Sequence, residues 1–386
     1  MTVCFLMGVL SAALYLVILF AKALLSWRYV ARHPEVESLD GSVTVLQPIL
    51  GGDPFLGDAL QTNLRSAAAG TIFLWLVDEN DIAGREVTEP IALAHPDHIR
   101  LILCPPCPAG MNPKLFKLNI AVPHVTTDFV AVLDDDTMLA SGHLQQAMAT
   151  LSDCDLYTGL PRYSTGGNLG SNLVAHFVNN NSILTYLSLL DWTGPLTING
   201  MFYVMRTDYL RALGGFAAIQ NQLCDDYSLA RLVMQHGGRL RQGVTSQLLR
   251  TSIAGPRHYL RQMHRWFLFA NVLVLDQSLP VQLLLVVLLG LPPLLLWGSL
   301  LSLAGGWFGA VVLITLLAIR HAILRSLQRR VFRDPPRFSW GLSVLAELLQ
   351  VVHLAHASLS PVIVWRSRRI RVGRHGAFTY LPDVQP

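Results

Sequence analysis

The sequence predicts an α/β domain that lies between apolar segments long enough to cross a membrane. Of the 386 residues, 52% are hydrophobic and 14% are charged, whereas an ordinary soluble domain has about 25% charged residues. The apolar excess is concentrated at the N-terminus and in the last third of the chain. The stretch between them has soluble composition and is long enough for one domain with its own core.

Charge and cysteine content narrow the class of protein. The formal net charge is +4, and much of the positive charge lies next to the apolar segments, which suits a membrane surface that carries anionic lipid. A nucleic-acid-binding protein would place a basic stripe within its folded domain, so we expect no nucleic-acid partner. The five cysteines are scattered, which argues against a disulfide framework. Cys104 and Cys107 have CxxC spacing, and we interpret them as reduced thiols in a proline-rich loop.

Continuous apolar runs in the central domain (residues 42–270) predict strands that are buried on both faces. They are residues 43–46, 72–77, 100–103 and 129–133, and a helix is predicted over residues 58–69. Strands separated by helices predict βαβ units and a mainly parallel sheet. Ligands of such sheets bind beyond the carboxyl ends of the strands. Two of the runs end at acidic residues, Asp78 after the second and Asp134-Asp135-Asp136 after the fourth.

The apolar segments predict a membrane protein whose central domain is cytosolic. Residues 1–28 are expected to form a retained transmembrane anchor, because the apolar run is too long for a signal peptide and no cleavage site is evident. Residues 280–326 contain two further runs of spanning length. The loop from Arg325 to Arg337 carries five arginines, so the positive-inside rule places it in the cytosol together with the central domain.

The last apolar stretch, residues 338–366, is followed by a basic tail, residues 367–386. A full crossing here would leave this tail outside the cell, against the positive-inside rule. The stretch is also polar for a lipid-facing helix, since polar side chains recur at Glu347, Gln350, His353 and His356. We therefore predict a re-entrant or interfacial segment that returns to the cytosolic side, rather than a third C-terminal crossing. Its histidines are expected to be hydrogen-bonded rather than metal-bound.

Asp134 and Asp136 are candidate ligands of a divalent cation. In extended backbone, residues i and i+2 point to the same side, so both carboxylates could meet one Mg²⁺ or Mn²⁺ ion. Such a cation would neutralise the charge of a leaving diphosphate. The alternative is a solvated acidic turn.

Two other polar motifs lie at predicted helices. Asp226 can act as a general base if it reaches an acceptor hydroxyl, whereas Asp225 beside it is more typical of a helix N-cap. Lys114 and Lys117 are three residues apart and would lie on one helix face. There they could meet phosphates or form a solvated helix edge.

The motif Gln262-Met263-His264-Arg265-Trp266 lies just before the second membrane segment. Arg265 has the forked donors that stabilise a diphosphate. Trp266 suits stacking on a sugar or lining a lipid entrance. An interfacial belt of tryptophan and arginine is the alternative interpretation.

Taken in chain order, these motifs resemble the GT-A glycosyltransferases, most closely the ceramide glucosyltransferase family with its bacterial hopanoid-linked relatives. The resemblance covers almost the whole chain. The matching positions are residues 43–54, Asp78, Asn112-Pro113-Lys114, Asp134 to Asp136, residues 158–161, 199–201 and 213–216, Asp226, Gln262-x-x-Arg265-Trp266 and residues 365–369. Gln47 in place of a family lysine and the additional Asp135 depart from the pattern, and they bear on the identity of the sugar and the lipid.

The resemblance implies a GT-A (nucleotide-diphospho-sugar transferase-like) fold and an inverting, UDP-sugar-dependent hexosyltransferase. It implies that glucose passes from UDP-glucose to a lipid hydroxyl in glycolipid (sphingolipid) metabolism, at a bacterial inner membrane. Asp226 would be the catalytic base, and Gln262, Arg265 and Trp266 would contact the acceptor or the diphosphate. The donor would lie against Pro48, Gly51, Asp78, Lys114 and Asp134, with Mn²⁺ or Mg²⁺ at Asp134 and Asp136.

The motifs leave other functions open. A hopanoid-lipid N-acetylglucosaminyltransferase would differ in sugar and acceptor. A processive polysaccharide synthase shares the three aspartates and the Gln-x-x-Arg-Trp element, but two or three C-terminal segments are few for a polymer channel. A non-catalytic membrane scaffold would have no need of the whole set of Asp78, Asp134, Asp136, Asp226 and Arg265.

Overall fold

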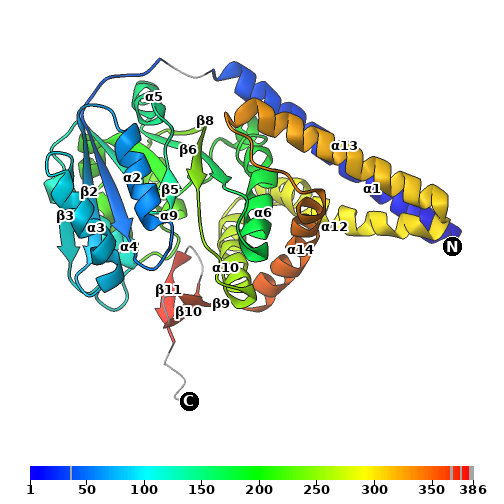
Figure 1. The fold of residues 1–386 in the computed structure, drawn as a ribbon. Helices are drawn as coiled ribbons and strands as arrows, with labels where there is room; N and C mark the ends of the chain where they lie inside the picture. The colour runs from blue at the N-terminus through cyan, green and yellow to red at the C-terminus, as the bar shows by residue number, and fades with distance from the viewer. Residues whose placement is uncertain (35–36, 366–367, 374–375, 382–386) are drawn as a thin grey trace. The chain divides into compact units, whose positions relative to one another are not determined.

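The computed structural model describes residues 1–34, 37–365, 368–373 and 376–381, so residues 366–367, 374–375 and 382–386 of the predicted basic end lie outside the described residues. The chain divides into two compact units. The helical unit comprises Met1–His33, Thr165–Thr193 and Ile253–Ile363. The α/β unit comprises Pro34–Ser164, Gly194–Ser252 and the described residues from Val364 onward. Each unit thus collects segments that are far apart in the sequence, as the colours of Figure 1 show.

The α/β unit is built on a mixed sheet of eight strands in the order β3-β2-β1-β4-β7-β6-β8-β5. The strands are β1 (Val43–Ile49), β2 (Thr71–Asp78), β3 (Ile99–Cys104), β4 (Phe129–Leu133), β5 (Thr137–Met138), β6 (Leu156–Tyr163), β7 (Phe202–Arg206) and β8 (Leu240–Leu249). The pairings β1–β2, β1–β4 and β2–β3 are parallel, as predicted. β7 is antiparallel to both β4 and β6, and β5 is antiparallel to β8. β6 is parallel to β8. The predicted mainly parallel sheet is therefore confirmed for the four predicted strands, whereas β5 and β7 make it a mixed sheet, because an apolar run reports burial and carries no information on strand direction.

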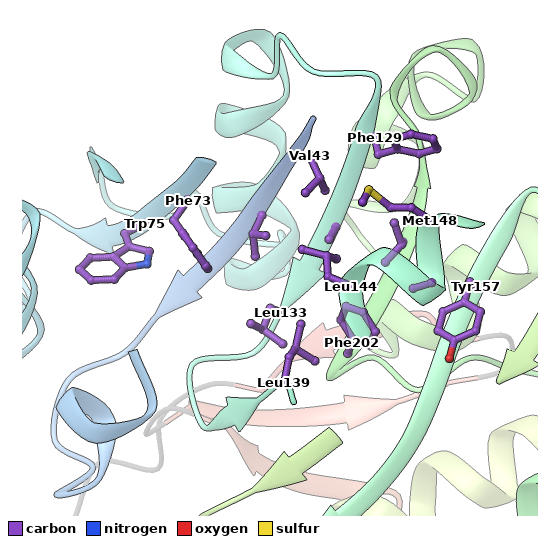
Figure 2. Packing of buried hydrophobic residues seen from close by; sticks show 14 of the residues in the cluster. Val43, Phe73, Trp75, Phe129, Leu133, Leu139, Leu144, Met148, Tyr157 and Phe202 are labelled. Atoms are coloured by element: carbon purple, nitrogen blue, oxygen red, sulfur yellow. The ribbon is translucent and has the colours of Figure 1, made fainter. Parts of the chain in front are cut away.

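Helices cover both faces of this sheet. They are α2 (Leu56–Ser66), α3 (Ile82–Ala94), α4 (Pro113–Ala121), α5 (His143–Thr150), α8 (Thr207–Ala212) and α9 (Asp225–Gln235). Alternate residues of β2 enter opposite cores: Phe73 and Trp75 pack with α2 and α5, whereas Leu74 packs with α4 and α9. Figure 2 shows the first of these clusters. Two-sided burial is why the predicted strands are continuously apolar.

A small sheet near the C-terminus contains β9 (Val362–Trp365), β10 (Arg368–Val372) and β11 (Phe378–Tyr380). β10 and β11 are antiparallel partners. Ile370 is fully buried and Val372 is nearly so. The described part of the predicted basic tail is therefore folded into the α/β unit.

The helical unit is formed by α1 (Thr2–Arg32), α6 (Leu169–Tyr186), α7 (Leu190–Thr193), α10 (Pro256–Leu275), α11 (Leu279–Leu285), α12 (Leu291–Ser299), α13 (Trp307–Val331) and α14 (Trp340–Leu359). Within the described residues, four stretches are long and apolar enough to cross a membrane: Thr2–Arg32, Leu279–Gly305, Trp307–Val331 and Trp340–Leu359. The first three coincide with predicted spanning segments. The fourth, α14, corresponds to the predicted re-entrant or interfacial segment, whose path relative to the bilayer stays a prediction.

The helical unit holds a buried ion pair between α13 and α14. Arg320 Nε donates to Glu347 Oε2 at 2.7 Å and also lies 2.9 Å from Tyr15 Oη of α1. Tyr15 donates to Glu347 Oε1 at 2.8 Å. Arg320 Nη1 donates to Ser343 Oγ at 2.9 Å, and that oxygen also accepts from Asn180 of α6. Four helices are thus joined through polar side chains that apolar neighbours shield from solvent.

We predict that removal of only one charged partner of this network lowers the stability of the protein. Glu347→Leu leaves the Arg320 guanidinium buried without its carboxylate, and breaking a buried pair in this way costs about 3–5 kcal/mol. The double variant Arg320→Met with Glu347→Leu should recover most of that loss, because two apolar side chains carry no desolvation penalty. Thermal unfolding in detergent measures both. A double variant that is less stable than Glu347→Leu would contradict this account.

Candidate active site

The topology gathers the predicted site residues of the α/β unit at one edge of the sheet. β1, β2 and β4 are parallel, so Gly51, Asp78 and Asp134 follow strands that end at the same edge. β7 is antiparallel to β4 and begins there, which brings in Gly200 and Met201. The hydrogen bond from Asp134 N to Met201 O, 2.9 Å long, continues this pairing beyond the strands. This edge is where α/β sheets bind ligands.

Lys114 lies at the centre of this edge. Asn112 caps α4 by accepting a hydrogen bond from Lys114 N at 2.9 Å, and Pro113 occupies the first turn, a position that proline favours. The Lys114 ammonium lies 2.7 Å from Asp134 Oδ1 and 2.9 Å from Asp225 Oδ2. It also donates to Gly200 O at 2.9 Å. Burial opposes the charge of this ammonium, but the two carboxylates outweigh it and raise the pKa of Lys114 well above its usual range.

Lys117 follows on the same face of α4. Its ammonium is almost fully buried, lies 2.9 Å from Asp78 Oδ2 and donates to Ile49 O at 2.8 Å. The predicted shared helix face is therefore confirmed, and both lysines meet carboxylates on it. The contact of Lys114 with a nucleotide stays a prediction.

Asp226 lies in the first turn of α9, next to Asp225. Tyr227 N donates to Asp226 Oδ1 at 2.7 Å. A Cβ added to Gly200 would lie 3.0 Å from the Asp226 Cβ, so a side chain there would crowd the carboxylate. Burial and the Asp225 carboxylate raise the pKa of Asp226 to about 7, although the Tyr227 amide and Lys114 oppose the rise. A carboxylate with such a pKa is matched to accepting a proton near neutral pH.

The Asp134–Asp136 segment turns rather than extending. Thr137 N donates to Asp134 O at 3.1 Å, which makes Asp135 and Asp136 the central residues of a β-turn. The expectation of extended backbone is therefore wrong, and the binding of one cation by Asp134 and Asp136 stays a prediction. Asp135 accepts from Leu50 N at 2.7 Å, and Asp136 accepts from the hydroxyls of Thr137 and Thr251.

Burial and the neighbouring carboxylates oppose ionisation of two acids of this turn. Burial and the neighbouring Asp136 raise the pKa of Asp135 to about 8. Burial and Asp134 raise the pKa of Asp136 to about 6. The two hydroxyls that Asp136 meets are neutral, and a hard cation prefers carboxylate oxygens of this kind. Asp136 thus suits such a cation, although no cluster of three or more acidic, histidine or cysteine ligands occurs within the described residues.

The loop after β1 is held by two acids that sequence analysis did not single out. Gly51 N donates to Asp81 Oδ2 at 2.7 Å, and Asp81 caps α3 through Gly84 N at 3.0 Å. A Cβ on Gly51 would collide with the Gly84 backbone. Asp53 accepts from Ser252 N at 3.2 Å. The signal for Asp81 was present, since an aspartate directly before an apolar-periodic helix is typical of an N-cap.

Gln262, Arg265 and Trp266 belong to α10 in the helical unit. Arg265 Nη2 donates to Gln262 Oε1 at 2.9 Å. The Trp266 ring stacks on Phe177 of α6, with centroids 6.2 Å apart. Their assignment to the acceptor or the diphosphate stays a prediction.

α10 packs along α14. His264 Nε2 lies 2.9 Å from Ser360 O, and its ring stacks on His356 with centroids 4.0 Å apart. Tyr259 Oη lies 3.0 Å from His353 Nε2. His353 is buried, so the expectation of a hydrogen-bonded histidine is confirmed for His353, and for His356 it stays a prediction.

Known proteins resemble the chain over most of its length. A family model described as glycosyl transferase family 21 matches residues 3–378. Ceramide glucosyltransferase 1 of Caenorhabditis elegans is 22% identical over 380 residues, which is 95% of this chain and 80% of that protein.

A solved structure of a GT-A glycosyltransferase shares the fold. It is the mannosyltransferase PcManGT from Pyrobaculum calidifontis in complex with GDP-Man and Mn²⁺, with a TM-score of 0.50 and 17% identity over 89% of this chain and 99% of that chain. The predicted GT-A fold is thereby confirmed. A more remote match is GalNAc-T7 with UDP, GalNAc and Mn²⁺, with a TM-score of 0.42 and 9% identity over 59% of this chain and 48% of that chain.

Asp135→Asn is predicted to stabilise the protein in a pH-dependent way. The Asp135 pKa is about 8 in the folded chain, against 3.8 as its ordinary value, so the folded state holds the proton more tightly. The stability that this gives is present below about pH 4 and is lost as the pH rises through about 8. Asparagine stays neutral and can still accept from Leu50 N. The melting temperature of the variant should therefore exceed that of the wild type by a few degrees at pH 9, about 1 kcal/mol, and the gap should close toward pH 4.

Thermal unfolding in detergent at pH 5, 7 and 9 measures this difference. Asp97→Asn, which removes an exposed carboxylate of the same unit, controls for the change in net charge. A gap between Asp135→Asn and the wild type that is the same at pH 5 and pH 9 would show that Asp135 carries no raised pKa.

Proposed function

This chain belongs to glycosyl transferase family 21, and on that premise we propose that it transfers a sugar from a UDP-sugar to a hydroxyl of a membrane lipid, with inversion at the anomeric carbon. The sugar we propose is glucose, since the worm relative is a ceramide glucosyltransferase. The observation that carries this proposal is Asp226, a carboxylate with a pKa of about 7 at the ligand-binding edge of the sheet. Its position next to Asp225, which pairs with Lys114, supports a role in proton removal during the transfer.

The proposed chemistry is one direct displacement. Asp226 takes the proton of the lipid hydroxyl, and the hydroxyl oxygen forms a bond to the anomeric carbon. The bond from that carbon to the diphosphate breaks, and UDP leaves with the electron pair. The acids Asp134 and Asp225 are held by the Lys114 ammonium, which keeps the base and the donor edge in a fixed arrangement. A Mn²⁺ or Mg²⁺ ion held by Asp134 and Asp136 would supply electrostatic stabilisation of the leaving diphosphate.

The proposed donor pocket lies along the loops that follow β1 and β2. Pro48 and Gly51 would contact the uridine together with Asp78. Lys117 supports this assignment, because its ammonium ties Asp78 to the end of β1 at Ile49 O. Gly51 supports it as well, since its amide is fixed by Asp81 and leaves no room for a side chain. A planar base would thus meet a rigid backbone surface.

The proposed location is the inner membrane of a bacterium, with the α/β unit in the cytosol. The four apolar helices support membrane insertion. The described C-terminal residues belong to the α/β unit, as does the chain directly after α1. Two crossings, Leu279–Gly305 and Trp307–Val331, lead out and back. The residues after α1 and the residues after α14 belong to the same unit, so both must lie on the cytosolic side of the membrane. The two crossings between them also return the chain to that side. α14 would therefore begin and end on the cytosolic side, which supports the proposed re-entrant or interfacial path.

A nucleotide-sugar panel tests the proposed function. Purified protein is incubated with UDP-sugars, GDP-mannose and a lipid extract, with Mn²⁺ or Mg²⁺, and products are identified by mass spectrometry. We expect a lipid that carries one hexose from UDP-glucose. Asp226→Asn should lower turnover by at least about 100-fold, as expected of a lost general base. UDP should still raise the melting temperature of that variant, because binding to the folded state stabilises it.

The same experiment includes a control and several outcomes that would contradict the proposed function. Asp97→Asn, a change of an exposed aspartate in the same unit, should leave turnover unchanged. Near-normal turnover of Asp226→Asn would remove that residue from the role of base. Transfer from GDP-mannose alone would overturn the proposed donor, and a ladder of products with many sugars would indicate a processive synthase.

Cysteine labelling tests the proposed topology. In intact cells, a membrane-impermeant reagent should spare Arg371→Cys and Asp40→Cys, which would both face the cytosol. It should label Trp307→Cys, because Trp307 is the first residue of α13, directly after the short connection between the two crossings, and is exposed. Permeabilised cells should give labelling of all three variants. Ready labelling of Arg371→Cys from outside would mean that α14 crosses the membrane.

A further inference from the structure

The acid pair Asp225-Asp226 depends on a short loop that precedes α9. The loop runs from Asn221 to Cys224, after a 3-10 turn that ends at Ile219. Within the described residues, the N-cap residue Cys224 provides no side-chain cap to α9. Asp225 and Asp226 follow this loop directly, so the contacts that hold the loop also position the backbone from which the two carboxylates extend.

One side of this loop is held by the segment that carries Lys114. The Asn112 side-chain amide donates to Gln222 O at 3.0 Å and to Leu223 O at 3.1 Å. The backbone amide of Asn112 donates to Gln220 O at 2.7 Å. Asn112 thus caps α4 and anchors the acid loop at once, which couples Lys114 to its partner Asp225.

The other side of the loop is held by the C-terminal hairpin, defined as β10, β11 and the described residues Gly373, Gly376 and Ala377 near their ends. Leu223 N donates to Gly376 O at 3.0 Å, and Gln222 and Ala377 form an antiparallel bridge. Tyr380 Oη lies 3.4 Å from Met111 O, next to Asn112. The hairpin therefore contacts both segments whose side chains meet at Lys114.

Gly376 of this hairpin has a backbone conformation and surroundings that favour glycine. Its φ is +78°, and an added Cβ would lie 3.3 Å from Gln222 Oε1, 3.7 Å from Ser228 Oγ and 4.0 Å from Cys224 Cβ. It is also buried. A Cβ there would require Gln222 of the acid loop to shift slightly, and it would be in ordinary van der Waals contact with Ser228 of α9.

We propose that the C-terminal hairpin is a positioning element of the active site, which fixes Asp225 and Asp226 against Lys114 by clasping the Gln222–Leu223 loop. This inference rests on the proposed function, in which Asp226 is the base. Residues that follow the last apolar helix, α14, would thus contribute to the transfer reaction together with the central segment. The hairpin touches the loop and not the reacting atoms, so it acts through the acids.

Two matched glycine variants of the full-length protein test the inference. Gly376→Ala introduces strain and a contact with the acid loop. Gly237→Ala is the control, because Gly237 has a similar φ of +74° in the same unit, with open space around an added Cβ. A misplaced catalytic group costs rate rather than donor binding, so we expect Gly376→Ala to lower kcat by about tenfold relative to Gly237→Ala. The KM for the nucleotide sugar should stay within about twofold.

A second measurement needs no turnover. Hydrogen exchange of the Leu223 amide should accelerate by about tenfold in Gly376→Ala, because its hydrogen bond to Gly376 O opens more often. Tyr380→Phe, a milder change that removes only the phenolic hydroxyl, should lower kcat in the same direction by a smaller factor. It keeps the test decisive if Gly376→Ala fails to fold.

The outcomes separate the two ideas. If the wild type transfers no sugar while the Leu223 amide exchanges faster in Gly376→Ala, the proposed function is wrong. The contact of the hairpin with the Gln222–Leu223 loop would still be supported. Equal kcat for Gly376→Ala and Gly237→Ala in an active enzyme would overturn the positioning role. Equal loss of kcat in both glycine variants would do the same, since it would show general destabilisation instead of an effect on the acid pair.

Discussion

The ammonium of Lys114 holds the candidate site together. It lies between Asp134, which follows β4, and Asp225, which begins α9, and it also meets Gly200 O at the start of β7. These three segments come from separate parts of the chain, and without a shared cation their carboxylates would repel one another at close range. One half-buried positive charge therefore allows two carboxylates to meet beside the sheet edge. Asp226 stands next to these two ion pairs and keeps the raised pKa that burial and Asp225 impose.

The helical unit solves a related electrostatic problem differently. There, Arg320 and Glu347 neutralise each other, and the hydroxyls of Tyr15 and Ser343 complete the hydrogen bonding. The ion pair occupies its partners fully, which suits a structural element among apolar helices. At the sheet edge, Asp135 and Asp136 are instead adjacent acids whose pKa values are raised by burial and by neighbouring carboxylates. A neutralised ion pair thus characterises the helical unit, and acids that oppose one another's ionisation characterise the candidate site.

Much of this arrangement could be predicted from the sequence, and the failures have physical causes. Strands such as the one that contains Trp75 can be recognised in the sequence, because burial on both faces of the sheet requires a continuous apolar run. The shared face of Lys114 and Lys117 follows from helical periodicity. The turn at Asp135 could not be predicted in that way, because three successive acids fit an extended or a turned backbone equally well. The hydrogen bond between Leu223 and Gly376 is even harder to predict from the sequence, because it joins the backbones of residues more than a hundred positions apart.

The hairpin follows the four apolar helices in the sequence, and this order has a consequence for biosynthesis. Proteins emerge from the ribosome N-terminus first, so β1 to β9 and these helices are made before β10 and β11. Until the hairpin has emerged, the Gln222–Leu223 loop is held only from the side of Asn112. The acid loop can therefore take up the arrangement described here only after those elements have been made.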